Sequence, residues 1–483
     1  MTDQQRRKLV LTSSAMALGA SLPGAVRAQQ RIVMNDASGL SPTPVFSHRV
    51  LRQDSEEQLI AALRAELKAA ASQGRPVVVG AARHSMGGQS LARNGTAITF
   101  AAPKCEPDTA ARVFRVQAGT RWHEVIQVLD PLHQSPAVMQ SNSDFAVAST
   151  FSVGAHGWPV AYGPFGSVVR AIRLMLADGS IVSCSRTENA ELFGLAMGGY
   201  GLLGIVLDLE VDMVPNTLMR PEYERMGAEA LAERFMKRLA EAPTVKMMYG
   251  RLNVARKDFF TEALLVSYRA EPTPAAGLPP VARHGALTGL TRSVYRSQIG
   301  SEPAKRARWL AETQGAPRLG SGIATRNTLL NEPVSNLGSS PAGRTDILHE
   351  YFVPPARFNE FLAACRQLIP RAKAEFLNVT LRYVAQDTTS VLAYAPTERI
   401  AAVMSFSQAM SPEGEADMML LTEALIDKVS ALGGSYYLPY RLHARPDQFH
   451  RIYPGAQRFA ERKRHYDPGL LFRNALWDNY LAA

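Results

Sequence analysis

The stretch Arg75-Pro-Val-Val-Val-Gly-Ala-Ala-Arg-His-Ser-Met-Gly-Gly-Gln89 decides how the rest of the chain is interpreted. Its apolar run, Pro76 to Val79, is rich in β-branched residues and too short for a helix, which favours a buried strand. The run breaks at Gly80, and a turn with Arg83 and His84 follows. Glycines adopt positive φ and bring backbone N–H groups close to an anion. The pattern predicts a strand ending in a phosphate-binding turn, although many α/β proteins contain such a loop with no chemical role.

A second stretch, residues 140–157, consists largely of small and hydroxyl residues and ends in Gly154-Ala-His-Gly157. Small side chains let the backbone lie against a flat ligand, while hydroxyl and free N–H groups satisfy phosphate oxygens. The second stretch therefore favours a ligand-binding role for the first over an ordinary loop.

Together the two stretches resemble the vanillyl-alcohol-oxidase-type flavoproteins, whose FAD domain is also called the PCMH-type domain. The resemblance covers roughly residues 45–215, and a weaker one appears at the C-terminus. The matching pieces, in family order, are the Arg83-His84-Ser85 turn, Ser152–Gly157, Gly166–Val168, Leu176–Val182, and Leu192–Phe193 with Gly198–Val206. The branches it resembles most are the sugar and aldonolactone oxidases, the decaprenylphosphoryl-ribose oxidases and, through Tyr437-Leu-Pro-Tyr440, the cytokinin dehydrogenases.

The resemblance implies an α+β fold, in which a two-subdomain PCMH-type FAD-binding domain is followed by an antiparallel-sheet substrate cap domain. Strand-like and helical patterns alternate beyond Pro215, which agrees with a sheet covered by helices. We expect an FAD domain over 40–215, a cap domain over 216–440 with a loop-rich region at 271–345, and a C-terminal segment, 441–483, that returns to the FAD domain.

Composition is that of an ordinary globular protein, with 46% hydrophobic and 20% charged residues among 483. The three cysteines, Cys105, Cys184 and Cys365, lie far apart, so no sulfur-based metal site is expected, although one disulfide pair stays open. The net charge of +10 is spread along the chain without a block of like charges. We therefore expect no metal and no nucleic acid; a basic surface suits an anionic cofactor.

Residues 1–28 have the pattern of an export signal. Arg6-Arg7-Lys8 precedes a weakly apolar core, Leu9 to Leu22, and Val26-Arg27-Ala28 places small residues where a signal peptidase cleaves. The core is too short for a stable membrane span. Paired arginines resemble a twin-arginine signal, which predicts a periplasmic or secreted protein; a basic tail without function is the alternative.

The resemblance implies that FAD is the cofactor and that His84 bonds covalently to its 8α-methyl carbon. A neutral imidazole is a competent nucleophile. A noncovalent FAD beside His84, or a core histidine, are the alternatives. The implied cofactor-binding residues are Gly80, Ala82, Arg83, His84, Ser85, Gly88, Gln89, Ser149, Ser152, Gly154, Ala155, His156, Gly157, Gly204, Ile205, Val206 and Asn474.

The catalytic candidates lie in the later half of the chain. Sugar-oxidising relatives carry a Glu-x-Arg pair on a cap strand, and here Thr380-Leu-Arg382 keeps only the arginine, which could stabilise negative charge on the flavin. Tyr437, Tyr440 and His443 are the nearest groups that could take a proton from the substrate. For these tyrosines, packing is the alternative role; His156 is at least as well explained as a structural residue.

These observations predict an FAD-dependent oxidoreductase. It would remove a hydride from the CH–OH carbon of a small sugar, lactone or related alcohol and pass electrons to oxygen or a redox partner. Two alternatives remain: oxidation of a CH–NH bond, as in cytokinin dehydrogenases, and an inactive binding protein that retains the flavin fold, which the missing glutamate makes worth testing.

Overall fold

The apolar run before Gly80 forms β4 (Val77–Val79), which pairs in parallel with β5 (Thr96–Phe100) in a sheet ordered β3-β5-β4, with β3 at Ser47–Leu51. The computed structural model describes residues 32–53, 55–241, 244–272, 277–282, 293–315, 317–318, 322–333 and 340–482. The expected export signal at 1–28 lies outside them. Helix α1 (Glu56–Ser72) precedes β4, and the Ser55 side chain caps its N-terminus by accepting a hydrogen bond from the Gln58 N–H.

We call residues 47–215 the FAD-side half, because the resemblance implies that this part binds FAD. A second, antiparallel sheet completes it. Its path is β10-β9-β11-β7-β6, and β8 also pairs with β11. The bounds are β6 (Cys105–Asp108), β7 (Val113–Gln117), β8 (Gln134–Pro136), β9 (Val169–Met175), β10 (Ile181–Ser185) and β11 (Ile205–Pro215). A hairpin turn at Asp178-Gly179 joins β9 to β10, with Gly179 at φ 81°. Helices α2 (Trp122–Leu129), α3 (Val147–Ser152) and α4 (Ala190–Ala196) pack around this sheet.

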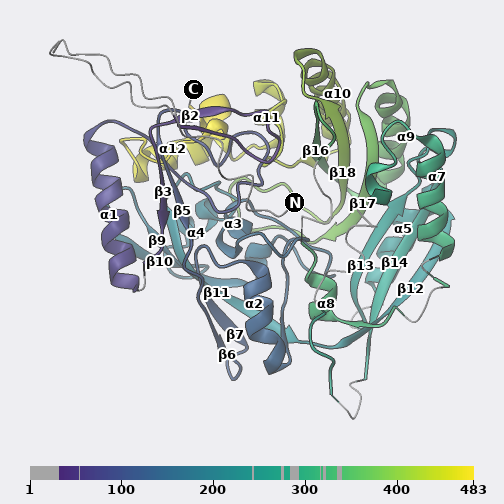
Figure 1. Ribbon diagram of the computed structural model, residues 1–483, viewed down its shortest axis with the longest axis horizontal. Helices are drawn as coiled ribbons and strands as arrows, with labels where there is room; N and C mark the ends of the chain where they lie inside the picture. Colours follow the sequence, from purple (N-terminus) through teal and green to yellow (C-terminus); the bar gives the residue numbers. More distant parts are fainter. Residues whose placement is uncertain are drawn as a thin grey trace, which may run out of the picture. The chain divides into compact units, whose positions relative to one another are not determined.

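The later half forms an eight-stranded antiparallel sheet, the cap sheet, in the order β15-β12-β14-β13-β17-β18-β16-β19. Its strands are β12 (Leu218–Gly227), β13 (Val245–Leu252), β14 (Glu262–Glu271), β15 (Ala324–Thr325), β16 (Arg344–Val353), β17 (Glu375–Val384), β18 (Arg399–Ala409) and β19 (Ser435–Tyr436). Helices α5 (Leu231–Leu239), α9 (Phe358–Leu368) and α10 (Pro412–Ala431) cover one face (Figure 1). The expected α+β class with a sheet-rich second half is confirmed.

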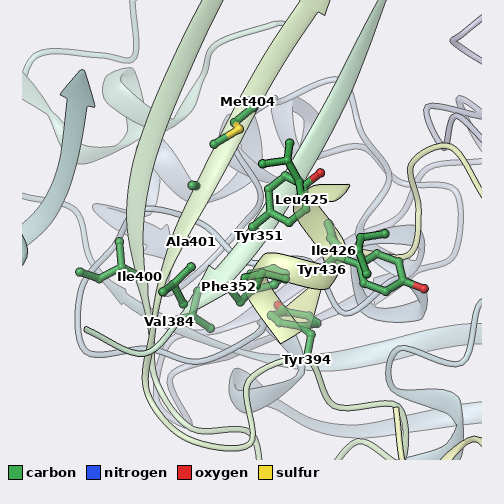
Figure 2. Packing of buried hydrophobic residues seen from close by; sticks show 14 of the residues in the cluster. Tyr351, Phe352, Val384, Tyr394, Ile400, Ala401, Met404, Leu425, Ile426 and Tyr436 are labelled. Carbon is green, nitrogen blue, oxygen red and sulfur yellow. The ribbon is translucent and has the colours of Figure 1, made fainter. Parts of the chain in front are cut away.

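Apolar residues under α10 fix one face of the cap sheet. Figure 2 shows Tyr351 of β16 and Met404 of β18 beside Leu425 and Ile426 of α10, all nearly inaccessible to solvent. Because side chains alternate along a strand, the even-numbered residues of β16 point to the opposite face. That face is the one available for a site.

The region predicted to be loop-rich, 271–345, contains regular structure as well. Helix α7 (Glu302–Leu310) begins at Ser301, whose hydroxyl accepts a hydrogen bond from the Ala304 N–H. Its Trp309 donates to the Glu262 carboxylate at 2.7 Å, and a short helix, α8 (Arg326–Leu330), follows β15. A tertiary contact with β14 thus supports α7 in a segment whose proline and glycine content favours loops.

The C-terminal segment hydrogen-bonds to β4, the strand that precedes residues 80–89. We call residues 80–89 the cofactor loop. After α11 (Pro446–Ile452) and α12 (Ala456–Tyr466), the Val77 N–H donates to the Leu471 carbonyl at 2.6 Å. Asp467 fixes this return by accepting from the backbone N–H groups of Leu471 and Phe472. In Figure 1 the yellow C-terminal helices accordingly lie beside the purple N-terminal strands.

Three further findings concern the described residues. All three cysteines are free thiols. No cluster of three histidine, cysteine or carboxylate side chains there is arranged to hold a metal ion. None of the helices described is both long enough and apolar enough to cross a membrane.

Candidate active site

A cavity of about 640 Å³ separates the FAD-side loops from the cap sheet. Residues drawn from the segments 79–90, 140–156 and 200–206 line one wall, and residues drawn from β16, β17, β18 and the segment 437–440 line the other. Most predicted site residues line it: Gly80, Ala82, Arg83, His84, Ser85, Gln89, Ser149, Ser152, Ala155, His156, Gly204, Ile205, Val206, Arg382, Tyr437 and Tyr440. The two sequence stretches that indicated a ligand therefore meet at one cavity, together with residues from the cap sheet.

His84 lies in the cavity wall with its ring stacked on Phe145, at 4.1 Å between centroids and 17° between planes. Burial lowers the pKa of His84 and outweighs the Asp144 carboxylate, which raises it. The imidazole is therefore neutral at neutral pH, which is the form needed for a nucleophile.

Unpartnered polar atoms concentrate in the same wall. The Arg83 guanidinium reaches Thr99 Oγ1 at 2.9 Å, yet its Nε and Nη2 atoms are buried without a partner among the described residues. The hydroxyl oxygens of Ser90 and Ser141 are likewise buried and unpaired there. Burial lowers the pKa of Arg83, and a buried cation without a counter-ion is unfavourable. A phosphate-bearing ligand such as FAD fits this set of donors.

Small residues form another part of the same cavity wall. Helix α3 presents Ser149 and Ser152 to the cavity, and Ala155 follows it. Gly154 adopts φ +60°, a conformation that disfavours side chains, and its carbonyl accepts a hydrogen bond from the Tyr394 hydroxyl at 2.7 Å. The geometry of this loop is thus held from behind, which leaves its small side chains free to contact a flat ligand.

The loop after β4 is joined directly to the cap-side segment 437–440. The Gln89 side-chain amide donates to the carbonyls of Leu438 at 2.6 Å and Tyr440 at 2.8 Å, and its Oε1 accepts from the Gly87 N–H. A Cβ at position 87 would approach the Tyr440 carbonyl oxygen to 2.5 Å, so only glycine permits this contact. Gln89 therefore positions the two walls relative to each other.

An N-terminal segment, Asp36 to Gly39, also lines the cavity, although the sequence pattern did not indicate it. The Asp36 carboxylate accepts hydrogen bonds from the Gly88 N–H at 2.8 Å and from Ser38. Arg441 holds the end of the segment through the Ser41 hydroxyl. The segment is thus tied both to the cofactor loop and to the chain that follows the cap sheet.

A cluster of polar side chains forms the cap-side wall. Glu350 of β16 is 3% exposed and hydrogen-bonds to His156 Nε2 through one carboxylate oxygen. The Tyr440 hydroxyl donates to the other oxygen at 3.1 Å. Arg382 of β17 lines the same wall, and its Nε is buried without a partner among the described residues. The cap-side wall of the cavity thus contains a cluster of a carboxylate, a phenol and a guanidinium.

The protonation states of this cluster follow from burial. Burial, reinforced by the Glu350 charge, raises the pKa of Tyr440 well above its ordinary value. Burial likewise raises the pKa of Tyr437, whose hydroxyl donates to the Val153 carbonyl at 2.9 Å. Burial lowers the pKa of Arg382, and the Glu350 carboxylate opposes this shift. Both tyrosines are therefore hydrogen-bond donors at neutral pH, not bases.

Five predicted site residues do not line the cavity; they are Gly88, Gly154, Gly157, His443 and Asn474. His443 bonds to Glu415 Oε1 at 2.8 Å and to Thr422, on the helix-covered side of the cap sheet. Asn474 donates to the Tyr200 carbonyl at 3.0 Å and thereby fastens the C-terminal segment. The structure gives these residues supporting contacts.

Glu350 is the main residue that sequence reasoning missed. It lies in Ile347–Val353, part of β16, and a carboxylate inside so apolar a run is the signal that indicates it. The cavity wall farther along β16 contains Asp346, which pairs with Arg296 at 2.6 Å, and near it the Tyr295 hydroxyl bonds to Ser405. These contacts join segments distant in sequence.

Comparison with known proteins finds a family match over part of the chain. Residues 48–185 match the family described as FAD binding domain. The chain is 36% identical to an alditol oxidase from Streptomyces sp. over 108 residues, which is 22% of this chain and 26% of the relative. It is 29% identical to a D-arabinono-1,4-lactone oxidase from Debaryomyces hansenii over 116 residues, 24% of this chain and 21% of the relative.

A cytokinin dehydrogenase from Oryza sativa is 30% identical over 171 residues, 32% of each chain. The chain thus spans about a third or less of the length of the three relatives described. They represent the sugar and aldonolactone oxidases and the cytokinin dehydrogenases, so the resemblance to these branches is confirmed over the matched region. Over residues 48–185 the chain is similar to the family described as FAD binding domain.

Proposed function

We propose that the protein is an FAD-dependent oxidoreductase that removes a hydride from the CH–OH carbon of a sugar, lactone or related small alcohol. The observation that carries the proposal is one cavity that joins the unpartnered donors around Arg83 to the polar cluster at Glu350 and Arg382. The names of the alditol and arabinonolactone oxidases support an alcohol donor. Electrons would leave to oxygen or to a redox partner.

The two walls of the cavity would have different roles. Arg83, Ser90 and Ser141 would hold the phosphates of FAD, and the small residues of 149–155 would contact its flat ring. Bound FAD supplies the two-electron oxidant. His84 would bond covalently to the cofactor, since its ring lies neutral in the cavity wall. Arg382 would offset negative charge that develops during oxidation.

The first experiment is a visible spectrum of the purified protein, followed by acid precipitation. We expect flavin absorbance that stays in the pellet for the wild type and moves to the supernatant for His84→Ala. His123→Ala is a matched control, because His123 bonds to the Ser143 carbonyl and does not line the cavity. A colourless protein would contradict the proposed function, whereas flavin released from the wild type would contradict only the covalent bond.

The second experiment is a donor panel under anaerobic conditions, with xylitol, sorbitol, D-arabinono-1,4-lactone and a cytokinin as probes. We expect an alcohol to bleach the flavin. The rival CH–NH function is favoured by the long match to the cytokinin dehydrogenase, and bleaching by the cytokinin alone would support it. A yellow protein that no donor bleaches would support the inactive binding protein, for which Thr380 in place of a glutamate is the argument.

Export to the periplasm or the medium is part of the proposal. Arg6-Arg7-Lys8 and the weakly apolar segment after it support a twin-arginine route. Replacing Arg6 and Arg7 by lysine should retain the protein in the cytoplasm, as measured by cell fractionation. Unchanged export of this variant would contradict the twin-arginine assignment.

A further inference from the structure

Glu350 is a buried carboxylate with unused acceptor capacity in a cavity wall. Its side chain is 2% exposed, and His156 and Tyr440 supply the side-chain hydrogen bonds that it receives. A carboxylate has about four acceptor positions, so positions remain for a ligand in the cavity. The burial of so polar a group is unfavourable unless these positions are used.

The contacts of Glu350 hold it firmly in place. The Tyr437 N–H donates to the Glu350 backbone carbonyl at 3.0 Å, and β18 pairs with β16 at this level through Val403. His156 packs edge-to-face on Phe352, with ring centroids at 5.5 Å. The carboxylate is therefore fixed by the sheet on one side and by an FAD-side histidine on the other, as a preorganised catalytic group requires.

Other proton acceptors near the cavity are less suitable. Tyr437 and Tyr440 are protonated donors, as derived above from their burial. His156 already binds Glu350 through Nε2, and its Nδ1 lies 3.3 Å from the Gly157 carbonyl. Asp346 is four residues along β16 from Glu350 and is paired with Arg296. Glu350 is the acceptor that lies beside Arg382, a cation whose Nε has no hydrogen-bond partner among the described residues.

We propose that Glu350 is the catalytic base, which accepts the proton of the substrate hydroxyl. This inference rests on the proposed oxidation of an alcohol. The O–H bond breaks and its proton goes to a Glu350 oxygen, while the carbon loses its hydrogen together with the electron pair to the flavin oxidant, which leaves a carbonyl. Arg382 stabilises the partial negative charge on the substrate oxygen, and Tyr440 orients the carboxylate.

The test begins with Glu350→Gln, which is isosteric and keeps an acceptor for Tyr440 and a donor for His156. We expect flavin reduction by the fastest alcohol of the donor panel to slow by about 10²–10⁴-fold, with flavin content unchanged. Glu375→Gln is the matched control, because Glu375 is a cap-sheet carboxylate that binds Lys305 at 2.9 Å and does not line the cavity. Its rate should stay within about threefold of the wild type.

Chemical rescue separates a base from a structural residue. In Glu350→Ala, added acetate or formate should restore a substantial part of the lost rate, because the small carboxylate can occupy the vacated space and accept the proton. Acetamide, which has the same shape but is not a base, should restore none. A variant that acetate and acetamide affect equally would contradict the proposal.

A binding measurement provides a readout other than turnover. In anaerobic, dithionite-reduced protein the alcohol binds without reacting, so its dissociation constant can be measured by calorimetry. Glu350→Gln should weaken the alcohol at least tenfold more than the corresponding carbonyl product, which has no hydroxyl proton to donate. Equal weakening of both ligands would point to a merely structural role.

The outcomes distinguish the two proposals. If no alcohol reduces the wild-type flavin, the proposed function fails and the role of Glu350 fails with it. If the wild type is reduced and Glu350→Gln is reduced equally fast, only the assignment of Glu350 is overturned.

Discussion

Gln89 and Tyr440, 351 positions apart in the chain, are joined by a hydrogen bond of 2.8 Å from the Gln89 side-chain amide to the Tyr440 carbonyl. The same amide donates to the Leu438 carbonyl, and both contacts are buried or partly buried. The cofactor loop thus fixes the backbone that presents Tyr440 to Glu350.

Gln89→Leu should destabilise the protein by about 1–3 kcal/mol, because it leaves buried backbone groups unpaired. It should also slow flavin reduction, since Tyr440 loses its support. Gln386→Leu is the control, because Gln386 is exposed and its side-chain amide donates to the Pro396 carbonyl at 3.0 Å. Denaturant unfolding and stopped-flow reduction measure the two effects. Equal stability of the two variants would contradict the importance of the contact.

Asp36→Ala should loosen the cofactor. The variant loses the hydrogen bond from the Gly88 N–H and the Ser38 contacts that hold residues 36–39 in the cavity wall. We expect the FAD dissociation constant to rise about tenfold or more, since hydrogen bonds to charged groups contribute about 1.5–3 kcal/mol. The constant is measured in a His84→Ala background, where FAD exchanges freely. Asp108→Ala, which removes an exposed turn contact to Ala111, should leave FAD affinity unchanged.

The sequence predicted the cofactor side of the site well, because that chemistry is local. A strand, a glycine-containing turn and a run of small residues specify a phosphate cradle within short stretches, and these stretches line the cavity. The same reasoning chose five residues that do not line the cavity. For example, His443 is close in sequence to Tyr440, yet its side chain bonds to Glu415 instead.

The cap side was predicted less well, because its geometry depends on strand register. The resemblance to sugar-oxidising enzymes implies a glutamate at position 380, but this chain has Thr380 there. In the sheet Thr380 pairs with Val403, and Val403 pairs with Glu350, so a carboxylate lies at the same level two strands away. Its partners His156 and Tyr440 are 194 and 90 positions distant, which no local pattern reveals.

His349 should make stability depend on pH. It is buried between Tyr351 and Thr422, and burial, assisted by His443, lowers its pKa from 6.5 to about 3, against the opposing effect of Glu415. The unfolded chain therefore binds a proton below pH 6.5 that the folded protein excludes until about pH 3. The free energy of unfolding should fall as the pH drops through this window, by at most on the order of 4–5 kcal/mol from this group.

His349→Gln, which cannot be charged, tests this linkage. The variant keeps a side chain able to bond to Thr422, so its unfolding free energy should decline less steeply between pH 6.5 and 4 than that of the wild type. His450→Gln serves as the control, because His450 is exposed on α11. Parallel curves for the wild type and His349→Gln, from urea unfolding at each pH, would show that His349 does not control this slope.

Arg83→Met should weaken FAD binding through the loss of a phosphate partner. Two nitrogen atoms of Arg83 are buried without a partner among the described residues, and methionine fills similar space without a charge. In a His84→Ala background the dissociation constant should rise roughly 10–100-fold, as expected for a charge-assisted hydrogen bond. ADP, which has the phosphates but no flavin ring, should lose affinity by a similar factor, whereas riboflavin, which has no phosphate, should lose little.

Arg64→Met is the control, because Arg64 donates to the Gly179 carbonyl away from the cavity. A uniform loss of affinity for all three ligands would instead indicate a collapsed loop, since only a phosphate contact distinguishes ADP from riboflavin.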